Sequence, residues 1–243
     1  MNKLRGIIFI PGGQMSDWIW KNFIPLIKNS QCLTINQRLE ENSLDSRISS
    51  SLADCSNHIL KQINEHNFDS IILIGHSIGG LLAALVAQQL KQKVEHVVYI
   101  ASNLPKNNTT AIDSFSFLQK LMIISFVKSQ IKKENVHVGT EAKYFISHFC
   151  NTSNSEVIEY VKSQYLNAEP ICLFKEKVYW DYSIEIPQTY IRLLKDKTIN
   201  RNLQTKMAKN LNISNVIDIE SDHLVMLSNT NLLYDKIKGI IKE

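Results

Sequence analysis

Hydrophobic positions fall along the chain in two alternating patterns. Short apolar runs typical of buried strands are separated by stretches in which apolar residues recur at helical spacing, as at Leu52, Cys55 and Ile59. Strands that alternate with helices predict an α/β fold, because parallel neighbours need a long crossover connection. We expect a doubly wound, mostly parallel sheet. The runs cover residues 6–10, 32–35, 70–75, 94–101, 189–194 and 216–219.

This alternation stops between residues 105 and 186. The stretch is helix-like or irregular and rich in aromatic residues, such as Phe149 and Trp180. It is too long to be a structureless loop inside a compact domain. We therefore predict a core of residues 1–104 and 187–243 with an inserted helical cap over 105–186. The cap covers a pocket or, alternatively, forms a second layer with no role in binding.

One serine interrupts the most apolar part of the sequence. Residues 75–80 read Gly-His-Ser-Ile-Gly-Gly, match the pattern G-x-S-x-G, and separate an apolar run from a helix-like stretch. In that pattern the serine lies on a strained turn between a strand and a helix, which presents its hydroxyl. We predict Ser77 as a nucleophile. The backbone N–H of Ile78, at the start of the helix, is the first predicted oxyanion donor.

A serine nucleophile needs a base and an acid, and in the fold that uses this turn the chain order is serine, acid, histidine. Of the seven histidines, only His223 follows the predicted cap. Asp196 directly follows the preceding apolar run, in a position to orient the ring of His223. Asp218 and Asp222 are the competing acids. The alternatives are a surface histidine and an aspartate that caps a loop.

The loop after the first apolar run supplies the second predicted oxyanion donor. It reads Pro-Gly-Gly-Gln, and glycine lets the backbone approach a ligand closely. Pro11 has no N–H, so we predict that Gly13 donates, with Gln14 behind it. An ordinary Pro-Gly turn is the alternative. Gln14, His76 beside the nucleophile and Trp180 in the cap are the predicted substrate contacts.

Composition and charge narrow the expected partners. The net charge of +4 is scattered along the chain, which does not favour a nucleic-acid partner. The four cysteines lack the close spacing of metal or redox motifs, and we predict no metal or cofactor. Too few apolar residues precede Pro11 for a signal peptide, and the run at 121–127 is shorter than a membrane span. We expect a cytoplasmic protein with a small-molecule substrate and no membrane partner. The oligomeric state is not predicted.

Several segments together resemble the α/β-hydrolase superfamily, in particular its branch of plant-type methyl esterases, hydroxynitrile lyases and bacterial relatives. Members carry H-G-x-x-x-x-x-W-x-W after the first core strand, and PGGQMSDWIW has both tryptophans, Trp18 and Trp20. VVYIASNLPKNNTT resembles the passage into the cap. LKDKTINRNLQTKM is similar to the acid loop, and ESDHLVMLSNTNLL to the catalytic-histidine loop. Pro11 departs from the branch, which has histidine there, and a glycine-rich turn after the second strand is replaced by TINQRLEENSLDS.

The resemblance implies the α/β-hydrolase fold and a triad of Ser77, Asp196 and His223. Hydroxynitrile lyases of the branch carry threonine in the oxyanion loop and lysine after the catalytic histidine, where this chain has Gly12 and Leu224. We therefore expect a serine hydrolase that cleaves a carboxylic ester of a small apolar or aromatic substrate through an acyl-enzyme. A hydroxynitrile-lyase-like enzyme, a carbon-carbon bond hydrolase, an acyltransferase and a ligand receptor that keeps the triad are the alternatives, because fold does not decide substrate.

Overall fold

A six-stranded parallel sheet lies at the centre of the computed structural model. The strand order is β2-β1-β3-β4-β7-β8, and every pairing in this sheet is parallel. Each predicted apolar run corresponds to one strand, so the α/β prediction is confirmed. The strands are β1 (Arg5–Ile10), β2 (Gln31–Thr34), β3 (Ser70–His76), β4 (Val94–Ile100), β7 (Gln188–Leu193) and β8 (Asn215–Ile219). The structure describes residues 4–37, 49–131, 146–164, 172–183 and 185–241.

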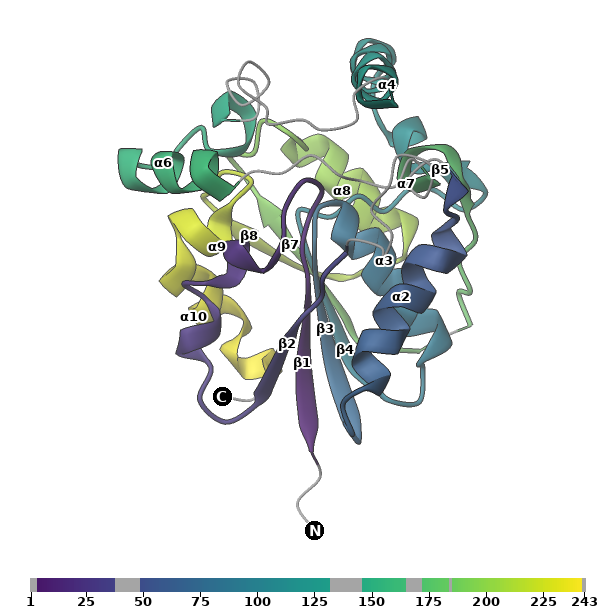
Figure 1. Ribbon diagram of the computed structural model, residues 1–243, viewed down its shortest axis with the longest axis vertical. Coiled ribbons are helices and arrows are strands. Elements are labelled where there is room, and N and C mark those ends of the chain that lie inside the picture. Colours follow the sequence, from purple (N-terminus) through teal and green to yellow (C-terminus); the bar gives the residue numbers. More distant parts are fainter. Residues whose placement is uncertain (1–3, 38–48, 132–145, 165–171, 184, 242–243) are drawn as a thin grey trace.

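Helices cover both faces of the sheet (Figure 1). Successive strand residues point to opposite faces, so in β1 Ile8 and Ile10 join one buried core while Ile7 and Phe9 join the other. Burial on both faces explains why the strands are almost continuously apolar. One face packs on α2 (Leu52–Asn64), α3 (Ile78–Gln89) and α8 (Arg201–Asn210), and the other on η1 (Asp17–Trp20), η2 (Ile24–Leu26), α9 (Val225–Ser228) and α10 (Thr230–Ile241).

Helix α2 begins where the sequence supplies a cap. The Ser51 hydroxyl accepts the backbone N–H of Asp54 (3.0 Å), and the Asp54 carboxylate accepts the backbone N–H of Ser51 (2.8 Å). This reciprocal pair satisfies donors that a helix N-terminus leaves without partners. The apolar stripe of α2 then packs onto the sheet, as the helical spacing predicted.

Among the described residues, no helix is both long enough and apolar enough to cross a membrane.

The ends of neighbouring strands lie level with one another. Ile10 of β1 is opposite Gly75 of β3, and His76 is opposite Ile100 of β4. On the other side of the sheet, Leu193 of β7 is opposite Ile219 of β8. The loops that follow these strands therefore leave the sheet along one edge, where the residues predicted to carry the chemistry are found.

Between β4 and β7 the chain leaves the central sheet. Helices α4 and α6 lie beyond the carboxyl ends of the strands, at the top of Figure 1. Residues 132–145 and 165–171 of the predicted cap lie outside the described residues, and its bounds at 105 and 186 stay a prediction. The described elements here are β5 (Thr109–Thr110), η3 (Ala111–Ser114), α4 (Phe117–Ile131), α6 (Ser155–Gln164), α7 (Cys172–Lys175) and β6 (Lys177–Val178).

Candidate active site

Ser77 forms the turn between β3 and α3. Its φ of 52° and ψ of −126° lie in a region that residues other than glycine seldom adopt. Three backbone hydrogen bonds hold it there: its N–H donates to Ile100 (3.0 Å), and its carbonyl accepts from Asn103 (2.9 Å) and Gly80 (3.1 Å). Such a conformation costs roughly 1–3 kcal/mol and persists only where the surroundings enforce it. The side chain is partly exposed at this strained turn.

The glycines on either side of the serine allow the strand and the helix to approach closely. A Cβ atom on Gly75 would lie 2.6 Å from the Cα atom of Gly80. On Gly79 it would lie 2.1 Å from the carbonyl oxygen of Pro11, which belongs to the loop after β1. Real side chains do not fit at such distances. The glycines of G-x-S-x-G therefore bring the serine turn against the first loop of the sheet.

Asp196 and His223 form a buried pair at the same edge. Nδ1 of His223 donates to Oδ2 of Asp196 at 2.6 Å, and both side chains are fully buried. The other carboxylate oxygen of Asp196 accepts the backbone N–H groups of Thr198 (2.7 Å) and Ile199 (3.0 Å). These bonds fix the carboxylate, and the carboxylate fixes the tautomer of the ring. The structure thus joins the predicted acid to the predicted base.

The competing acids have other partners. Asp218 on β8 is paired with Arg192, which donates from Nε (2.7 Å) and Nη2 (2.8 Å), and this guanidinium lowers the pKa of the Asp218 carboxyl. Asp222 is fully buried and accepts hydrogen bonds from the cap region and from its own loop. In the described part of the chain, neither carboxylate bonds to the ring of His223. The geometry therefore favours Asp196 as the acid.

The second ring nitrogen of His223 has no hydrogen-bond partner among the described residues. Nδ1 is committed to Asp196, so Nε2 is the nitrogen that can accept a proton. The described structure contains no hydrogen bond between this nitrogen and the Ser77 hydroxyl. Catalytic hydrogen bonds commonly shorten only when substrate is bound. The roles of Ser77, Asp196 and His223 as a triad stay a prediction that this arrangement favours.

The loop after β1 packs directly on the serine turn. A Cβ atom on Gly12 would lie 2.9 Å from Cβ of Ser77. A turn follows, in which the N–H of Met15 donates to the carbonyl of Gly12 (3.3 Å) and Gln14 adopts a φ of 63°. Gly13 lies within this turn. The loop predicted to hold an oxyanion is thus in contact with the nucleophile, while the donors Gly13 and Ile78 and the substrate contact of Gln14 stay predictions.

His76 is fully buried behind this loop instead of lining an open surface. Its Nε2 donates to the backbone carbonyl of His223 (2.9 Å), and its ring centroid lies 4.6 Å from that of His223. Its Nδ1 faces Gly12, where a Cβ atom would lie 2.7 Å away. Burial, and secondarily the neighbouring His223, lower the pKa of His76 well below its usual range. The structure therefore places a neutral imidazole between the loop and the base; its predicted substrate contact stays a prediction.

Trp180, the predicted substrate contact from the cap region, packs against α3. Its indole N–H donates to the carbonyl of Pro105 (2.8 Å), and its side chain lines a hollow of about 220 Å³ with Ala84 and Ala87 of α3. Because a helix rises 1.5 Å per residue, those alanines lie roughly 10 and 15 Å along α3 from Ser77. This indole packs the cap region against α3, and its predicted substrate contact stays a prediction.

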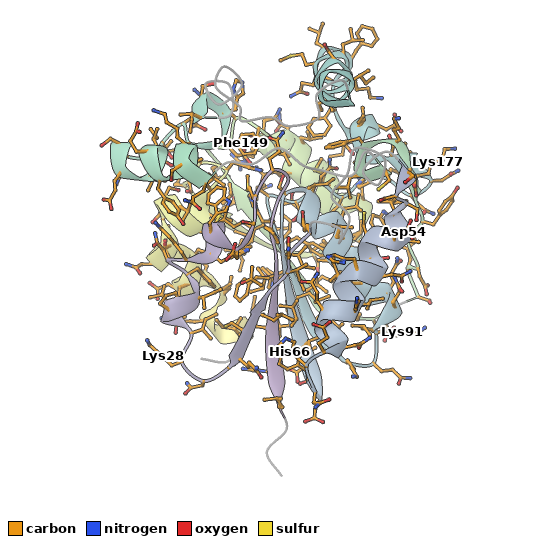
Figure 2. The ribbon with its side chains drawn as sticks, viewed as in Figure 1. Lys28, Asp54, His66, Lys91, Phe149 and Lys177 are labelled. Carbon is orange, nitrogen blue, oxygen red and sulfur yellow. The ribbon has the colours of Figure 1, made fainter. Side chains whose placement is uncertain are left out.

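A different aromatic residue of the cap region meets the base. The ring of Phe149 stands edge-on to His223, with centroids 4.7 Å apart and planes at 89°. Figure 2 shows Phe149 in the upper part of the molecule, beyond the ends of the strands. Sequence reasoning listed Phe149 only as one of many cap aromatics, because no local pattern distinguishes the one that folds back onto a loop 74 positions later.

Comparisons with known sequences agree with this architecture. Residues 7–126 match the family described as alpha/beta hydrolase fold. Methylesterase 8 of Arabidopsis thaliana is 24% identical, over 96% of this chain and 88% of its own length. Alpha-hydroxynitrile lyase of Arabidopsis thaliana is 23% identical, over 99% of this chain and 98% of its own. This chain is thus similar to an esterase and to a lyase along nearly its whole length.

Solved structures share the fold. An extracellular alpha/beta-hydrolase from a Paenibacillus species, described as sharing structural and functional homology with Tobacco Salicylic Acid Binding Protein 2, superposes with a TM-score of 0.81 at 17% identity, covering 96% of this chain and 98% of that one. Polyneuridine aldehyde esterase superposes with a TM-score of 0.74 at 17% identity, over 98% and 100% of the two chains. The parallel sheet, the family match over residues 7–126 and these superpositions together show that the chain has the α/β-hydrolase fold.

Proposed function

We propose that this protein is a serine hydrolase that cleaves a carboxylic ester of a small apolar or aromatic compound. The observation that carries the proposal is the buried Asp196–His223 hydrogen bond of 2.6 Å at the sheet edge where Ser77 occupies its strained turn. The similarity to methylesterases supports an ester as the substrate. The aromatic ring of Phe149 beside His223 supports an apolar or aromatic group in the pocket.

Acylation begins with proton transfer from Ser77 to Nε2 of His223 as the serine oxygen attacks the ester carbonyl. Asp196 holds the ring in the tautomer that leaves Nε2 free and stabilises the imidazolium that forms. The negative oxygen of the tetrahedral intermediate then accepts the backbone N–H groups of Ile78 and Gly13. Each such donor lowers the barrier by roughly 3 kcal/mol, because it is already aimed at the developing charge.

Acylation ends when the alcohol departs, and deacylation then follows with water as the nucleophile. The imidazolium first gives its proton to the leaving alcohol, which departs and leaves the acyl group on Ser77. His223 then removes a proton from water as the water oxygen attacks the acyl carbon, and the tetrahedral intermediate collapses as the imidazolium returns this proton to the oxygen of Ser77 and the acid departs. The same base therefore acts twice, and the serine is regenerated unchanged.

A hydroxynitrile lyase is the second candidate, because one relative carries that name. The residue after the base argues against it. Leu224 is fully buried in the core at the N-terminus of α9, so this position supplies no cation next to His223. An apolar side chain cannot stabilise a departing cyanide, and the esterase is therefore the better-supported function.

Turnover of short-chain p-nitrophenyl esters tests the proposal. We expect the unmodified protein to hydrolyse p-nitrophenyl butyrate and Ser77→Ala to lose roughly 10⁶-fold in kcat, as when a serine nucleophile is removed. Ser163→Ala, which removes an exposed hydroxyl on α6, is the matched control and retains full turnover. Fewer than one turnover per protein over hours would contradict a hydrolase, and labelling of Ser77 under the same conditions would then favour a receptor.

A further inference from the structure

Asp222 is a fully buried carboxylate between the cap region and the loop that carries His223. From the cap region it accepts the backbone N–H of Thr152 (3.1 Å) and the hydroxyl of Ser153 (2.8 Å). From its own loop it accepts the hydroxyl of Ser228 (2.7 Å) and the backbone N–H of Leu224 (3.3 Å). One side chain thus connects two segments that are about 70 positions apart in the sequence.

The same cap segment also reaches the loop of the acid. The Asn151 side-chain amide donates to the backbone carbonyl of Lys195 (3.0 Å), the residue before Asp196. Residues 149–153, which we name the latch segment, therefore contact both loops that carry the acid–base pair. At its other end the latch segment places Phe149 edge-on to the ring of His223. The latch segment therefore connects the cap region to the loop that carries His223.

The buried carboxylate of Asp222 depends on the hydrogen bonds that its oxygens accept. An ionised carboxylate taken out of water is stable only when its oxygens are hydrogen-bonded, and bonds to a charged acceptor are stronger than those between neutral groups. Both oxygens of Asp222 accept here. Its negative charge is felt nearby, since burial and secondarily Asp222 raise the pKa of the Cys150 thiol in the latch segment to about 12. Without the cap side, Oδ2 of Asp222 would lose the two hydrogen bonds from Thr152 and Ser153, and without the carboxylate these two donors would lose their acceptor.

We propose that Asp222 is a positioning residue that seats the latch segment on the catalytic loops, so that Phe149 forms the wall of the acyl pocket beside His223. This inference rests on the proposed hydrolase function. Asp222 does not touch the reacting atoms; it acts through Thr152 and Ser153 on the placement of Phe149. Substrate affinity therefore depends on Asp222. From the sequence alone, this residue was only a competing candidate for the catalytic acid.

The test compares variants on the two sides of the network, using p-nitrophenyl butyrate for KM and kcat and diisopropyl fluorophosphate for the reactivity of Ser77. Ser153→Ala removes one hydroxyl from the cap side, and we expect KM to rise about fivefold with kcat and the inactivation rate nearly unchanged. Asp222→Asn also disturbs the loop of the base, and we expect kcat/KM to fall at least about tenfold. Asp218→Asn, a surface carboxylate paired with Arg192, is the matched control and stays within about twofold of the unmodified protein.

A double-variant cycle separates positioning from general destabilisation. Phe149→Ala alone raises KM, and adding Ser153→Ala to it raises KM no further, because Ser153 acts through Phe149. The inference would be overturned if the two substitutions raised KM independently, so that their effects multiplied in the double variant. It would also be overturned if Ser153→Ala and Asp222→Asn left KM unchanged while the unmodified protein turns over. If Asp222→Asn does not fold, Ser153→Ala and the double-variant cycle still test the positioning role. Absence of both turnover and Ser77 inactivation in the unmodified protein would instead contradict the proposed hydrolase.

Discussion

Ser77 has a positive φ angle, which residues within a strand or a helix do not have. Its φ of 52° turns the chain sharply between β3 and α3, and the side chain stays partly exposed while its neighbours are buried. The sequence predicted this turn because glycines at fixed spacing around a serine have one common structural cause. It also predicted which aspartate meets His223, since Asp196 follows directly after its strand. Contacts of His76 were not predictable, because burial of a histidine depends on what packs over it.

The buried, neutral state of His76 makes stability depend on pH. Its pKa in the folded protein is lowered by burial, so below about pH 6.5, its ordinary value, the unfolded chain binds a proton that the folded protein does not. The free energy of unfolding therefore falls as pH falls, by up to about 1.4 kcal/mol per pH unit for this one group.

Urea unfolding at several values between pH 7.5 and 5 measures this slope. We expect His76→Gln to have a shallower slope than the unmodified protein by about one proton. His96, whose pKa is also lowered by burial, contributes to the slope of both proteins and does not affect the difference. Identical slopes would show that His76 is not held neutral in the folded protein.

At the scale of elements, the active site depends on how closely α3 approaches β3 and the loop after β1. The helix is apolar on nearly all sides and buried along most of its length, so its sequence predicts burial without saying which side meets the loop. The contact with Pro11 is visible only in the structure, where its carbonyl occupies the space that a side chain on Gly79 would need. The same carbonyl of Pro11 accepts a hydrogen bond from the Gln37 side chain.

Two glycine substitutions in helices test this close approach. In Gly79→Ala the new Cβ atom would meet the backbone oxygens of Pro11 and Ile10 at 2.1 and 2.6 Å, so we expect a loss of about 3 kcal/mol in the free energy of unfolding. Gly239→Ala, in α10, meets no atom within 4 Å and should gain about 0.8 kcal/mol from helix propensity. Denaturant unfolding of both variants measures the contrast. Equal effects of the two substitutions would show that the turn is not tightly packed.

At the scale of the whole molecule, the sheet was more predictable than what covers it. Apolar runs and crossover spacing determine six strands and their direction, and the order serine, acid, histidine places the predicted triad at one edge. The cap region has no such repeat, and its contacts join residues far apart in the chain, as Phe149 with His223 and Asp222 with Ser153 do. Trp180 was predicted at the site for its aromatic character alone, and that character serves equally well in packing against α3.

Cysteine reactivity reports whether the cap region is seated on the core. Cys172 of α7 lies 3.6 Å from Cys55 of α2, sulfur to sulfur, and both are buried, as is Cys150. The contact with Cys55 and burial raise the pKa of Cys172, which keeps this thiol protonated and slow to react. Only Cys32 is partly exposed.

With an aromatic disulfide reagent we therefore expect about one thiol per chain to react quickly in the native protein and all four in guanidinium chloride. Cys32→Ser should remove the fast phase. Rapid native reaction of two or more thiols would contradict a seated cap region.

The central claim is that Ser77 is a nucleophile activated by His223. A fluorophosphonate probe, followed by intact-mass measurement and peptide mapping, tests it most directly because the probe forms a stable adduct only with an activated serine. We predict one adduct per chain, at Ser77, in the unmodified protein, and none in Ser77→Ala. His223→Gln, folded to the same extent, should react at least about a thousandfold more slowly, since the serine then has no base. An unlabelled folded protein, or an adduct that persists in Ser77→Ala, would contradict the account.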